Sequence, residues 1–293
     1  MQVIITAAGL GTRFSNQGVL TPKPMATVMG RPAIQYLIEA FPDYWSLIFV
    51  IGEHFRLSGL AELIQKLRPN SVIVYTAYSE RGPIDTVLAA KNYLQPSLPT
   101  LVSYCDYSLV WNETDFLSKI SEPLVDAGVV TYQGFHPTYL GPNTYCHALV
   151  DQQDQRILAL QEKKLFTNDI EKEKTSVGLY YFKTAEFLFS CLSEQLNQDL
   201  KYGREYYISL AIQAMMNVRP SIFVKNYQVE QILQLGTPSD IERAEYWYDL
   251  LILKNPEPIP LQWNKIDPHS RSYEIEKAYW QRMLFHLFKI GVA

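Results

Sequence analysis

Short apolar runs alternate with amphipathic stretches through the first half of the chain. Four runs are almost continuously apolar, as expected of strands that are covered on both faces. These runs are residues 2–7, 46–52, 71–77 and 100–105. Between them, apolar residues recur at helical spacing. The predicted helices are residues 32–41, 57–67 and 83–93. Strands that alternate with helices predict an α/β fold with a parallel sheet.

From about Gly128 onward the pattern becomes richer in strands. Residues 128–136 and 176–183 predict single strands. Residues 147–164 predict a hairpin, because a polar DQQDQ centre lies between apolar flanks. We expect this half to form a wall over the sheet. The other elements predicted here are helices at 184–196 and 205–216 and a strand at 222–227.

The last fifth of the chain contains two more predicted helices. The first begins in LGTPSD, because Thr237, Pro238 and Asp240 occupy the N-cap, N1 and N3 positions. After Leu251 a proline-rich segment without periodicity predicts a linker on the surface. The helix at residues 273–290 has a broad apolar face, which we expect to pack on its own chain rather than on another subunit.

Composition and charge exclude several classes of protein. The 293 residues are 47% hydrophobic and 19% charged, enough for a full core. A net charge of −4 offers no basic field to nucleic acid or to an anionic membrane. We expect neither a signal peptide nor a membrane anchor, since no apolar run reaches the ~18 to 20 residues that a membrane span needs. Three cysteines without zinc-ligand spacing fit a reducing compartment, so we expect a cytoplasmic protein.

The first predicted strand ends in a loop rich in glycine, AAGLGTRF. Gly9 and Gly11 would let backbone N–H groups approach an anion without a Cβ in the way. Arg13 offers a planar fork for phosphate oxygens, and Lys23, aimed by Pro24, offers a movable point charge. The loop lacks the third glycine of the dinucleotide fingerprint and the Gly-Lys-Ser/Thr of a Walker A loop. Two cations on a glycine loop therefore predict a triphosphate site.

These segments resemble the signature of the sugar-1-phosphate nucleotidyltransferases (nucleotide-sugar pyrophosphorylases). That signature runs G-x-G-T-R-F/L, then P-K-P-M/L, then a segment like G-R/K-P-I. The matching residues are Gly9, Gly11, Thr12, Arg13, Phe14, Pro22, Lys23, Pro24, Met25, Gly30, Arg31 and Pro32. The resemblance continues to about Ala244.

The resemblance implies a Rossmann-like (GT-A-like) fold, with a mixed, mostly parallel central sheet flanked by helices. The predicted last helix, which the resemblance does not cover, adds a C-terminal helical extension. Residues 1–251 would form the nucleotidyltransferase domain. Its nucleotide-binding half would span about 1–126 and its acceptor-binding half about 127–251. Residues 252–293 would form the linker and the last helix.

The resemblance also implies an activity and its site residues. The enzyme would transfer a nucleotidyl group from an NTP to a sugar-1-phosphate or similar phosphorylated metabolite and release pyrophosphate. Such chemistry needs positioning and charge neutralisation rather than a nucleophilic side chain. The implied nucleotide-binding residues are Ala8, Gly9, Gly11, Thr12, Arg13, Lys23 and Gly82. The loop and Arg13 would hold the β- and γ-phosphates, Lys23 would contact the α-phosphate, and Gly82 would lie against the base.

Asp106 follows a predicted buried strand, at the carboxyl end where open α/β sheets bind ligands. The matching Asp of the family holds the catalytic Mg²⁺, so Arg13, Lys23 and Asp106 form the implied catalytic set. The neighbouring Cys105 is interpreted as a small buried residue rather than as a nucleophile.

The family's second metal-binding Asp, in D-x-G-T-P, is replaced here by Gln234. Three explanations compete. Asp106 and substrate phosphates alone would hold the metal, which we favour because Mg²⁺ often takes only one or two carboxylates. Glu230 or Asp240 would supply a second carboxylate. Alternatively, the protein would be a degenerate, non-catalytic member of the family.

Further residues match the acceptor site of the family. By resemblance to E-E-K-P, Glu162 would accept hydrogen bonds from substrate hydroxyls, and Lys163 would bind the substrate phosphate. Val177 and Gly178 match a strand beside the substrate. The substrate-binding residues implied are Tyr145, Glu162, Lys163, Val177 and Gly178.

Other positions in this half bear on the identity of the acceptor. Cys146 stands where family members often carry a glycine that touches the sugar, so the acceptor is not necessarily a hexose. Tyr132 and His136 are further candidates to line the acceptor pocket, although aromatic residues on such strands more often belong to the core. GFHP and YCDYSLVW resemble a subgroup linked to bacterial capsule or surface polysaccharide, which implies that pathway.

Two other functions remain open. One is a nucleotide-binding regulatory protein on the same fold, motivated by Gln234 and the aromatic last helix. The other is a GT-A glycosyltransferase, which needs an Asp-x-Asp site where this chain has Cys-Asp-Tyr-Ser. A homo-oligomer is compatible with each of these functions.

Overall fold

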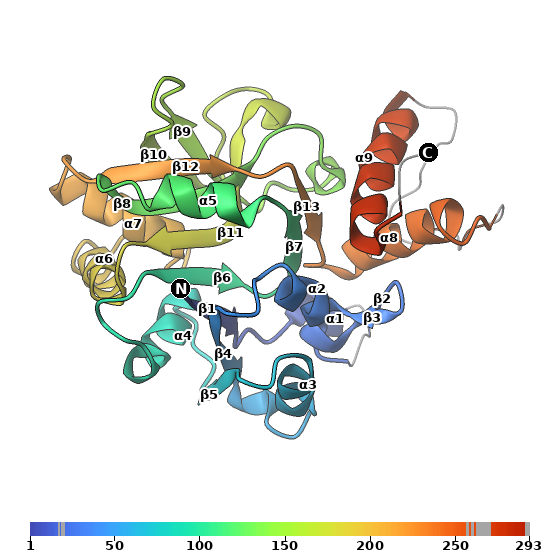
Figure 1. The fold of residues 1–293 in the computed structure, drawn as a ribbon, viewed down its shortest axis with the longest axis horizontal. Helices are drawn as coiled ribbons and strands as arrows, with labels where there is room; N and C mark the ends of the chain where they lie inside the picture. The colour runs from blue at the N-terminus through green and yellow to red at the C-terminus, as the bar shows by residue number, and fades with distance from the viewer. Residues whose placement is uncertain (17, 19–20, 256–257, 259–260, 262–270, 291–293) are drawn as a thin grey trace.

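The computed structural model describes residues 1–16, 18, 21–255, 258, 261 and 271–290. In this part of the chain, nine strands form one central sheet (Figure 1). They are β1 (Gln2–Ala7), β4 (Ser46–Gly52), β5 (Val72–Thr76), β6 (Thr100–Tyr104), β8 (Val125–Tyr132), β9 (Cys146–Val150), β10 (Ile157–Glu162), β11 (Lys174–Phe182) and β12 (Phe223–Gln228). The main path runs β10-β9-β11-β6-β1-β4-β5, and β8 joins β11 to β12.

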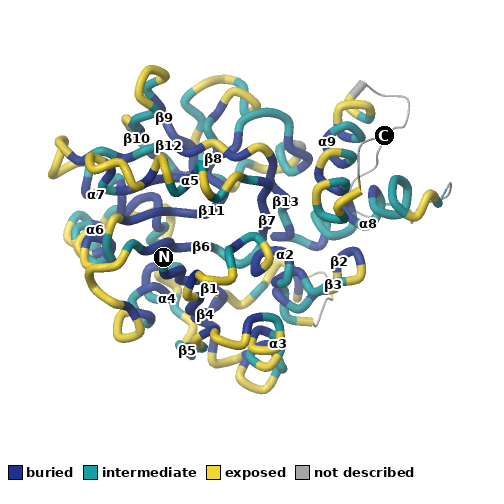
Figure 2. Tube along the Cα trace, in the orientation of Figure 1, coloured by how far each residue is buried: buried dark blue, intermediate teal, exposed yellow. Residues whose placement is uncertain are grey.

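The first half builds the parallel part of the sheet, as predicted. β1 pairs in parallel with both β4 and β6, and β4 pairs in parallel with β5. Every residue of β1 is buried, because its two faces enter two different cores. Val3 and Ile5 pack with α2 (Ala33–Glu39) and α3 (Leu60–Leu67), whereas Ile4 packs with α4 (Pro83–Ala89). Figure 2 shows β1 and most of β4 and β6 buried, whereas the edge strand β5 is only partly buried.

The second half extends this sheet and does not form a separate wall over it, so that expectation was wrong. β11 pairs antiparallel with β6, which makes the sheet mixed and continuous. The predicted hairpin is confirmed, since β9 and β10 pair antiparallel. α6 (Ala185–Asn197) and α7 (Ile208–Val218) cover the face that α4 covers, while α5 (Glu113–Ile120) lies on the other face.

Three predicted helices begin or end at least three residues away from the predicted position. α3 begins at Leu60, because Gly59 precedes it with a left-handed φ of 81°. α4 ends at Ala89 and is followed by a 3₁₀ turn at Lys91–Tyr93. α7 begins at Ile208 rather than at residue 205, because the preceding residues form a bridge and an extended segment. In each case a local turn interrupts a pattern that looked continuous.

Two small antiparallel sheets were not predicted. β2 (Thr27–Val28) pairs with β3 (Arg31–Pro32), and β7 (Tyr107–Val110) pairs with β13 (Gln231–Gln234). The second pairing joins segments more than 120 residues apart in sequence. It places Gln234 opposite Tyr107, next to the predicted metal ligand Asp106. β7 and β13 therefore position one side of the candidate site.

The C-terminal helices lie side by side at one end of the sheet (Figure 1). α8 (Pro238–Leu251) begins with the predicted capping box, in which Thr237 and Asp240 bond each other's backbone N–H groups. α9 (Arg271–Phe288) packs on α8 and β13 and buries Tyr279 and Trp280, so packing on its own chain is confirmed. Most of the predicted proline-rich linker lies outside the described residues. Among the described helices, none has the length and apolar character needed to cross a bilayer.

Candidate active site

Two adjoining cavities lie at the carboxyl ends of β1 and β6. The larger has a volume of about 570 Å³ and the smaller about 300 Å³. Tyr104, Asp106 and Tyr207 line both cavities and so mark the seam between them. This position agrees with the rule that open α/β sheets bind ligands beyond the carboxyl ends of their strands.

The smaller cavity gathers most of the predicted nucleotide-binding residues. Its wall includes Ala8, Gly9, Gly11, Lys23 and Gly82. Gly11 adopts a left-handed φ of 64° at the start of the short helix α1 (Thr12–Ser15). This conformation favours glycine at the turn of the loop.

Two other residues of the predicted nucleotide site, Thr12 and Arg13, do not line the smaller cavity. Thr12 lines neither cavity, and Arg13 lines the larger one. Gly82 precedes α4 with a φ of 74°, and a Cβ built there would lie 3.1 Å from Cβ of Glu205. Glycine at position 82 therefore avoids a close contact with the side chain of Glu205 in the wall of the smaller cavity.

Lys23 and Asp106 form an ion pair at the seam. Asp106 stands between β6 and β7, and its Oδ2 accepts a hydrogen bond of 2.5 Å from Lys23 Nζ. Desolvation raises the pKa of Asp106, but the charge and hydrogen bond of Lys23 outweigh it, so the pKa lies below its usual value. Asp106 is therefore ionised at neutral pH. The pKa of Cys105 is raised to about 12, mainly by desolvation, which agrees with a non-nucleophilic role.

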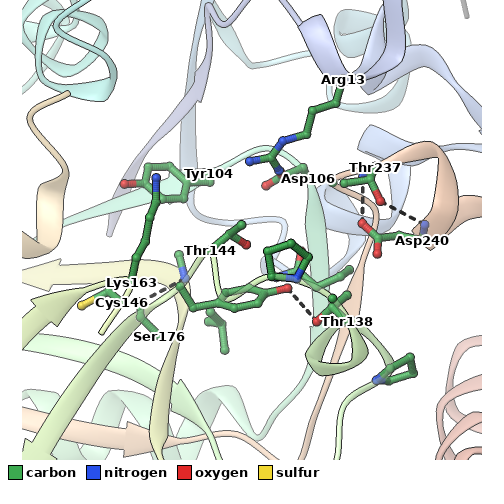
Figure 3. A pocket seen from close by; sticks show the side chains of 18 of the residues that line it. Arg13, Tyr104, Asp106, Thr138, Thr144, Cys146, Lys163, Ser176, Thr237 and Asp240 are labelled. Carbon is green, nitrogen blue, oxygen red and sulfur yellow. Dashed lines mark hydrogen bonds between the residues drawn. The ribbon is translucent and has the colours of Figure 1, made fainter. Parts of the chain in front are cut away.

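Asp240 lies beside this ion pair, whereas Glu230 lines neither cavity. A Cβ built on Gly236 would lie 3.1 Å from Asp106 Oδ2, 3.6 Å from Asp240 Oδ2 and 3.7 Å from Lys23 Nζ. Desolvation raises the pKa of Asp240, and the charge of Asp106 adds to this rise. In Figure 3, Asp240 and Thr237 approach the cavity from the side of α8. Of the two carboxylates considered as a replacement for the missing Asp, only Asp240 adjoins Asp106.

The oxygen atoms around Gly236 fit a Mg²⁺ ion. Asp106 and Asp240 place hard oxygen donors beside Gly236, Gln234 lines the same cavity, and Mg²⁺ takes oxygen ligands from few carboxylates together with substrate phosphates. Among the described residues, no three His, Cys, Asp or Glu side chains gather as a metal-binding group. A metal here would therefore depend on phosphate oxygens for part of its coordination.

Glu162 and Lys163 lie at the end of β10 and line the larger cavity. Glu162 is buried and accepts a hydrogen bond from Ser209, and Lys163 Nζ donates one of 2.9 Å to Tyr207 Oη. Desolvation raises the pKa of Glu162 to about 7, although Ser209 and Lys163 oppose this rise. Cys146 adjoins Glu162 and has a strongly raised pKa because of its burial. The wall of the larger cavity therefore places a carboxyl group that titrates near neutral pH, Glu162, beside a cation, Lys163.

The raised pKa of Glu162 predicts a measurable pH dependence of stability. The folded protein holds this proton up to about pH 7, whereas the unfolded carboxyl group releases it near pH 4.5. The free energy of unfolding of the wild type should therefore fall, relative to that of Glu162→Gln, by about 2 kcal/mol between pH 5 and pH 7.5. Urea denaturation at several pH values measures this difference.

The exposed Glu62 on α3 provides a matched control for this titration. Glu62→Gln should follow the wild-type pH profile. A wild-type profile parallel to that of Glu162→Gln would show that Glu162 is already ionised at pH 5.

Val177 and Gly178 line the larger cavity, where β11 departs from regular pairing. Gly178 has a φ of 87°, and a Cβ built there would lie 2.8 Å from Cδ2 of Tyr104. The Tyr104 ring in turn packs edge-on against Tyr180, with ring centroids 6.0 Å apart. Glycine at 178 therefore lets the strand pass directly over the seam residue Tyr104.

We expect Gly178→Ala to lower the free energy of unfolding by about 2 to 4 kcal/mol, because the new methyl group adds overpacking to backbone strain. Gly203 is the matched control, since its φ is 62° and no atom lies within 4 Å of a Cβ built there. Gly203→Ala should cost only about 1 kcal/mol, from the backbone alone. Equal losses in the two variants, measured by urea denaturation, would contradict a steric role for Tyr104.

Tyr145 lines the larger cavity, as predicted, but Tyr132 and His136 do not. Tyr145 Oη donates a 2.7 Å hydrogen bond to Thr138 (Figure 3). His136 is buried behind the wall and packs against the ring of Tyr279 on α9, 5.3 Å away. Of the two alternatives for Tyr132 and His136, the core position is the one observed, because both side chains pack in the layer between the sheet and α9.

Three further residues belong to this site and were not predicted, namely Tyr207, Ser209 and Arg243. Tyr207 and Ser209 reach the site because α7 packs against β10, and no sequence pattern indicated that contact. Arg243 could have been predicted from the sequence. It follows Asp240 by three residues and therefore lies on the same face of the predicted helix.

Comparison with protein families finds a match to the MobA-like NTP transferase domain over residues 3–167, more than half of the chain. Among curated proteins, the bifunctional protein GlmU of Thermotoga maritima is 28% identical over 224 residues. The match covers 75% of this chain and 45% of that protein. The chain therefore spans about half the length of the curated relatives it matches.

Solved structures share the fold at low sequence identity. The nucleoside-diphosphate-sugar pyrophosphorylase of Vibrio cholerae RC9 superposes with a TM-score of 0.65 at 18% identity, covering 82% of this chain and 97% of that one. The inositol-1-phosphate CTP transferase of T. maritima superposes with a TM-score of 0.61 at 18% identity, covering 82% of this chain and 90% of that one. These two similarities show the fold alone.

Proposed function

The chain belongs to the family of MobA-like NTP transferase domains, and from that premise we propose that it transfers a nucleotidyl group from an NTP to a sugar-1-phosphate or a related phosphorylated metabolite. The product would be a nucleotide-activated sugar or its analogue, together with pyrophosphate. The observation that carries this proposal is the Lys23–Asp106 ion pair, which stands where the two cavities meet.

The two cavities suggest separate places for the two substrates. The smaller is lined largely by residues from the first 106 positions and the larger mostly by residues 137–243. This supports our division of the domain into a nucleotide-binding half and an acceptor-binding half. The names of the two structural neighbours, a sugar pyrophosphorylase and an inositol-1-phosphate CTP transferase, are consistent with a phosphorylated acceptor.

In the proposed reaction, a phosphate oxygen of the acceptor attacks the α-phosphorus of the NTP. A new P–O bond forms while the bond between the α-phosphorus and the bridging oxygen to the β-phosphorus breaks, and pyrophosphate leaves. Lys23 would leave its ion pair with Asp106 and bind the α-phosphate instead. There it would neutralise the negative charge that develops during the reaction. Arg13, whose charge lowers the pKa of Asp106 and opposes the rise in that of Tyr207, would neutralise phosphate oxygens near the seam.

Asp106, with Asp240 and Gln234 beside it, would hold the Mg²⁺ ion. When bound, this ion would neutralise phosphate charge and polarise the α-phosphoryl group. Lys163 would bind the acceptor phosphate, and Glu162 would accept hydrogen bonds from acceptor hydroxyls. We also propose that the product serves synthesis of surface polysaccharide, in keeping with the subgroup that the sequence resembles.

Pyrophosphate release tests the proposal directly. The protein is incubated with Mg²⁺ and each of ATP, CTP, GTP, UTP and dTTP, against a panel of sugar-1-phosphates and other phosphorylated metabolites. We expect release with one base and a narrow class of acceptor. NTP binding by calorimetry without release from any combination would overturn the proposal and support the regulatory alternative.

A further inference from the structure

Arg243 is a buried cation in the wall of the larger cavity. It lies on the cavity-facing side of α8, and its residue is 5% exposed. Lys23 and Lys163 do not lie on α8. Lys23 belongs to the 3₁₀ turn at Lys23–Met25, and Lys163 follows β10. The charge of Arg243 is therefore additional to the phosphate-binding cations proposed above.

Glu276 of α9 holds this arginine in one orientation. Its Oε1 accepts a 2.5 Å hydrogen bond from Arg243 Nε, and its Oε2 accepts one of 2.8 Å from Nη2. Oε1 also accepts hydrogen bonds from the indole N–H groups of Trp247 and Trp280, at 2.8 and 3.3 Å. The carboxylate is thus saturated with donors, and the guanidinium is gripped along its Nε–Nη2 edge.

This grip leaves the other end of the guanidinium unused. A guanidinium has five N–H groups, and Glu276 takes two of them. Arg243 Nη1 is buried and finds no hydrogen-bond partner among the described residues. A buried donor without a partner is costly, so an acceptor supplied by a bound ligand would stabilise this end of the guanidinium.

The unused Nη1–Nη2 end is a two-pronged donor. Such a fork matches the two oxygens of a carboxylate, or two oxygens of a phosphate, and buried surroundings strengthen the contact. A single hydroxyl oxygen would satisfy only part of it. An oxyanion with two oxygen atoms accepts a hydrogen bond from each prong, and Glu276 already balances the charge of the guanidinium.

We propose that Arg243 selects acceptors that carry a second acidic oxyanion, in addition to the phosphate that attacks the nucleotide. Glu276 acts as a positioning residue for this contact. The inference rests on the proposed function insofar as the larger cavity binds a phosphorylated acceptor. It narrows the acceptor class from phosphorylated metabolites in general to phosphorylated acids and bisphosphates.

Matched probes separate this inference from the proposed activity. Glucose 1-phosphate carries one acidic group, glucuronic acid 1-phosphate adds a carboxylate, and glucose 1,6-bisphosphate adds a phosphate. Binding is measured by calorimetry in the presence of NTP with Mg²⁺ withheld, so that turnover is not required. We expect at least one acidic probe to bind about tenfold to a hundredfold more tightly than glucose 1-phosphate. The tighter of the two acidic probes identifies the oxyanion as carboxylate or phosphate.

Two variants test the role of Arg243. Arg243→Lys keeps the charge but removes the fork, and Arg243→Met with Glu276→Leu replaces the whole ion pair by apolar residues, a change that folded proteins often tolerate. Both should lose the preference for the acidic probe. Where turnover is seen, KM for the acidic acceptor should rise about tenfold or more, while kcat changes by less than about threefold.

Lys119→Met is the charge-matched control, because Lys119 is exposed on α5 and lines neither cavity. It should keep the wild-type preference. Equal binding of all three probes to the wild type, or no binding of any, would overturn the inference. A preference that survives in the double variant would overturn it as well. Binding preference without pyrophosphate release would instead count against the proposed function alone.

Discussion

Replacing Asp106 with Asn is expected to lower the rate of pyrophosphate release by a factor of about 10² to 10³, the usual cost of removing one preorganised charge contact from an active site. The substitution keeps the shape of the side chain but removes the charge that holds Lys23 at 2.5 Å. It also removes the ionised carboxylate proposed to hold Mg²⁺. Steady-state kinetics with the preferred NTP and acceptor measure the loss.

The same variant should still bind NTP in the absence of Mg²⁺, within about threefold of the wild type, because the glycine loop and Lys23 remain. Asp115→Asn is the isosteric control, since Asp115 pairs with Lys119 on the exposed face of α5. It should leave turnover unchanged. Full activity of the Asp106 variant would contradict the placement of the reaction at the seam.

Replacing Glu276 with Leu is expected to lower the free energy of unfolding by about 3 to 5 kcal/mol, as for other buried ion pairs that lose one partner. Arg243 would remain buried without its counter-charge, and the indole N–H groups of Trp247 and Trp280 would lose their acceptor. Urea denaturation of the full chain gives the difference from wild type.

Glu274 provides the control on the same helix, because it lies in the first turn of α9 and is exposed. Glu274→Leu should cost less than about 1 kcal/mol. Adding Arg243→Met to Glu276→Leu should restore part of the lost stability, since both charges are then gone while the indole N–H groups of Trp247 and Trp280 still lack their acceptor. A loss below about 1 kcal/mol in the single variant would show that water reaches Arg243.

Local patterns predicted most of the secondary structure correctly. The apolar runs that form β1 and β4 matched the strands residue for residue, because strands covered on both faces carry few polar residues. The capping box at Thr237 and Asp240 was predicted as well, since it involves only four consecutive residues. Predictions failed where pairing partners are distant, as for β7 and β13, whose four residues each show no distinctive pattern.

The signature residues were sufficient to identify the family, but not to place every side chain. Tyr132 and His136 lie on or beside a strand in the correct half, yet they pack behind the cavity wall against α9. The question raised by Gln234 also depended on distant contacts. Asp240 adjoins Asp106, whereas Glu230 does not, only because β13 pairs with β7 and leads into α8.

The sequence by itself determined the α/β order of elements, the glycine loop with its two cations, and the family, because each depends on residues near one another in the chain. The tertiary structure alone decided which charges meet. Lys23 reaches Asp106 across 83 positions, and Arg243 reaches Glu276 across 33. It also decided the pKa of Glu162, because desolvation depends on what the fold packs around a carboxyl group and not on its neighbours in sequence.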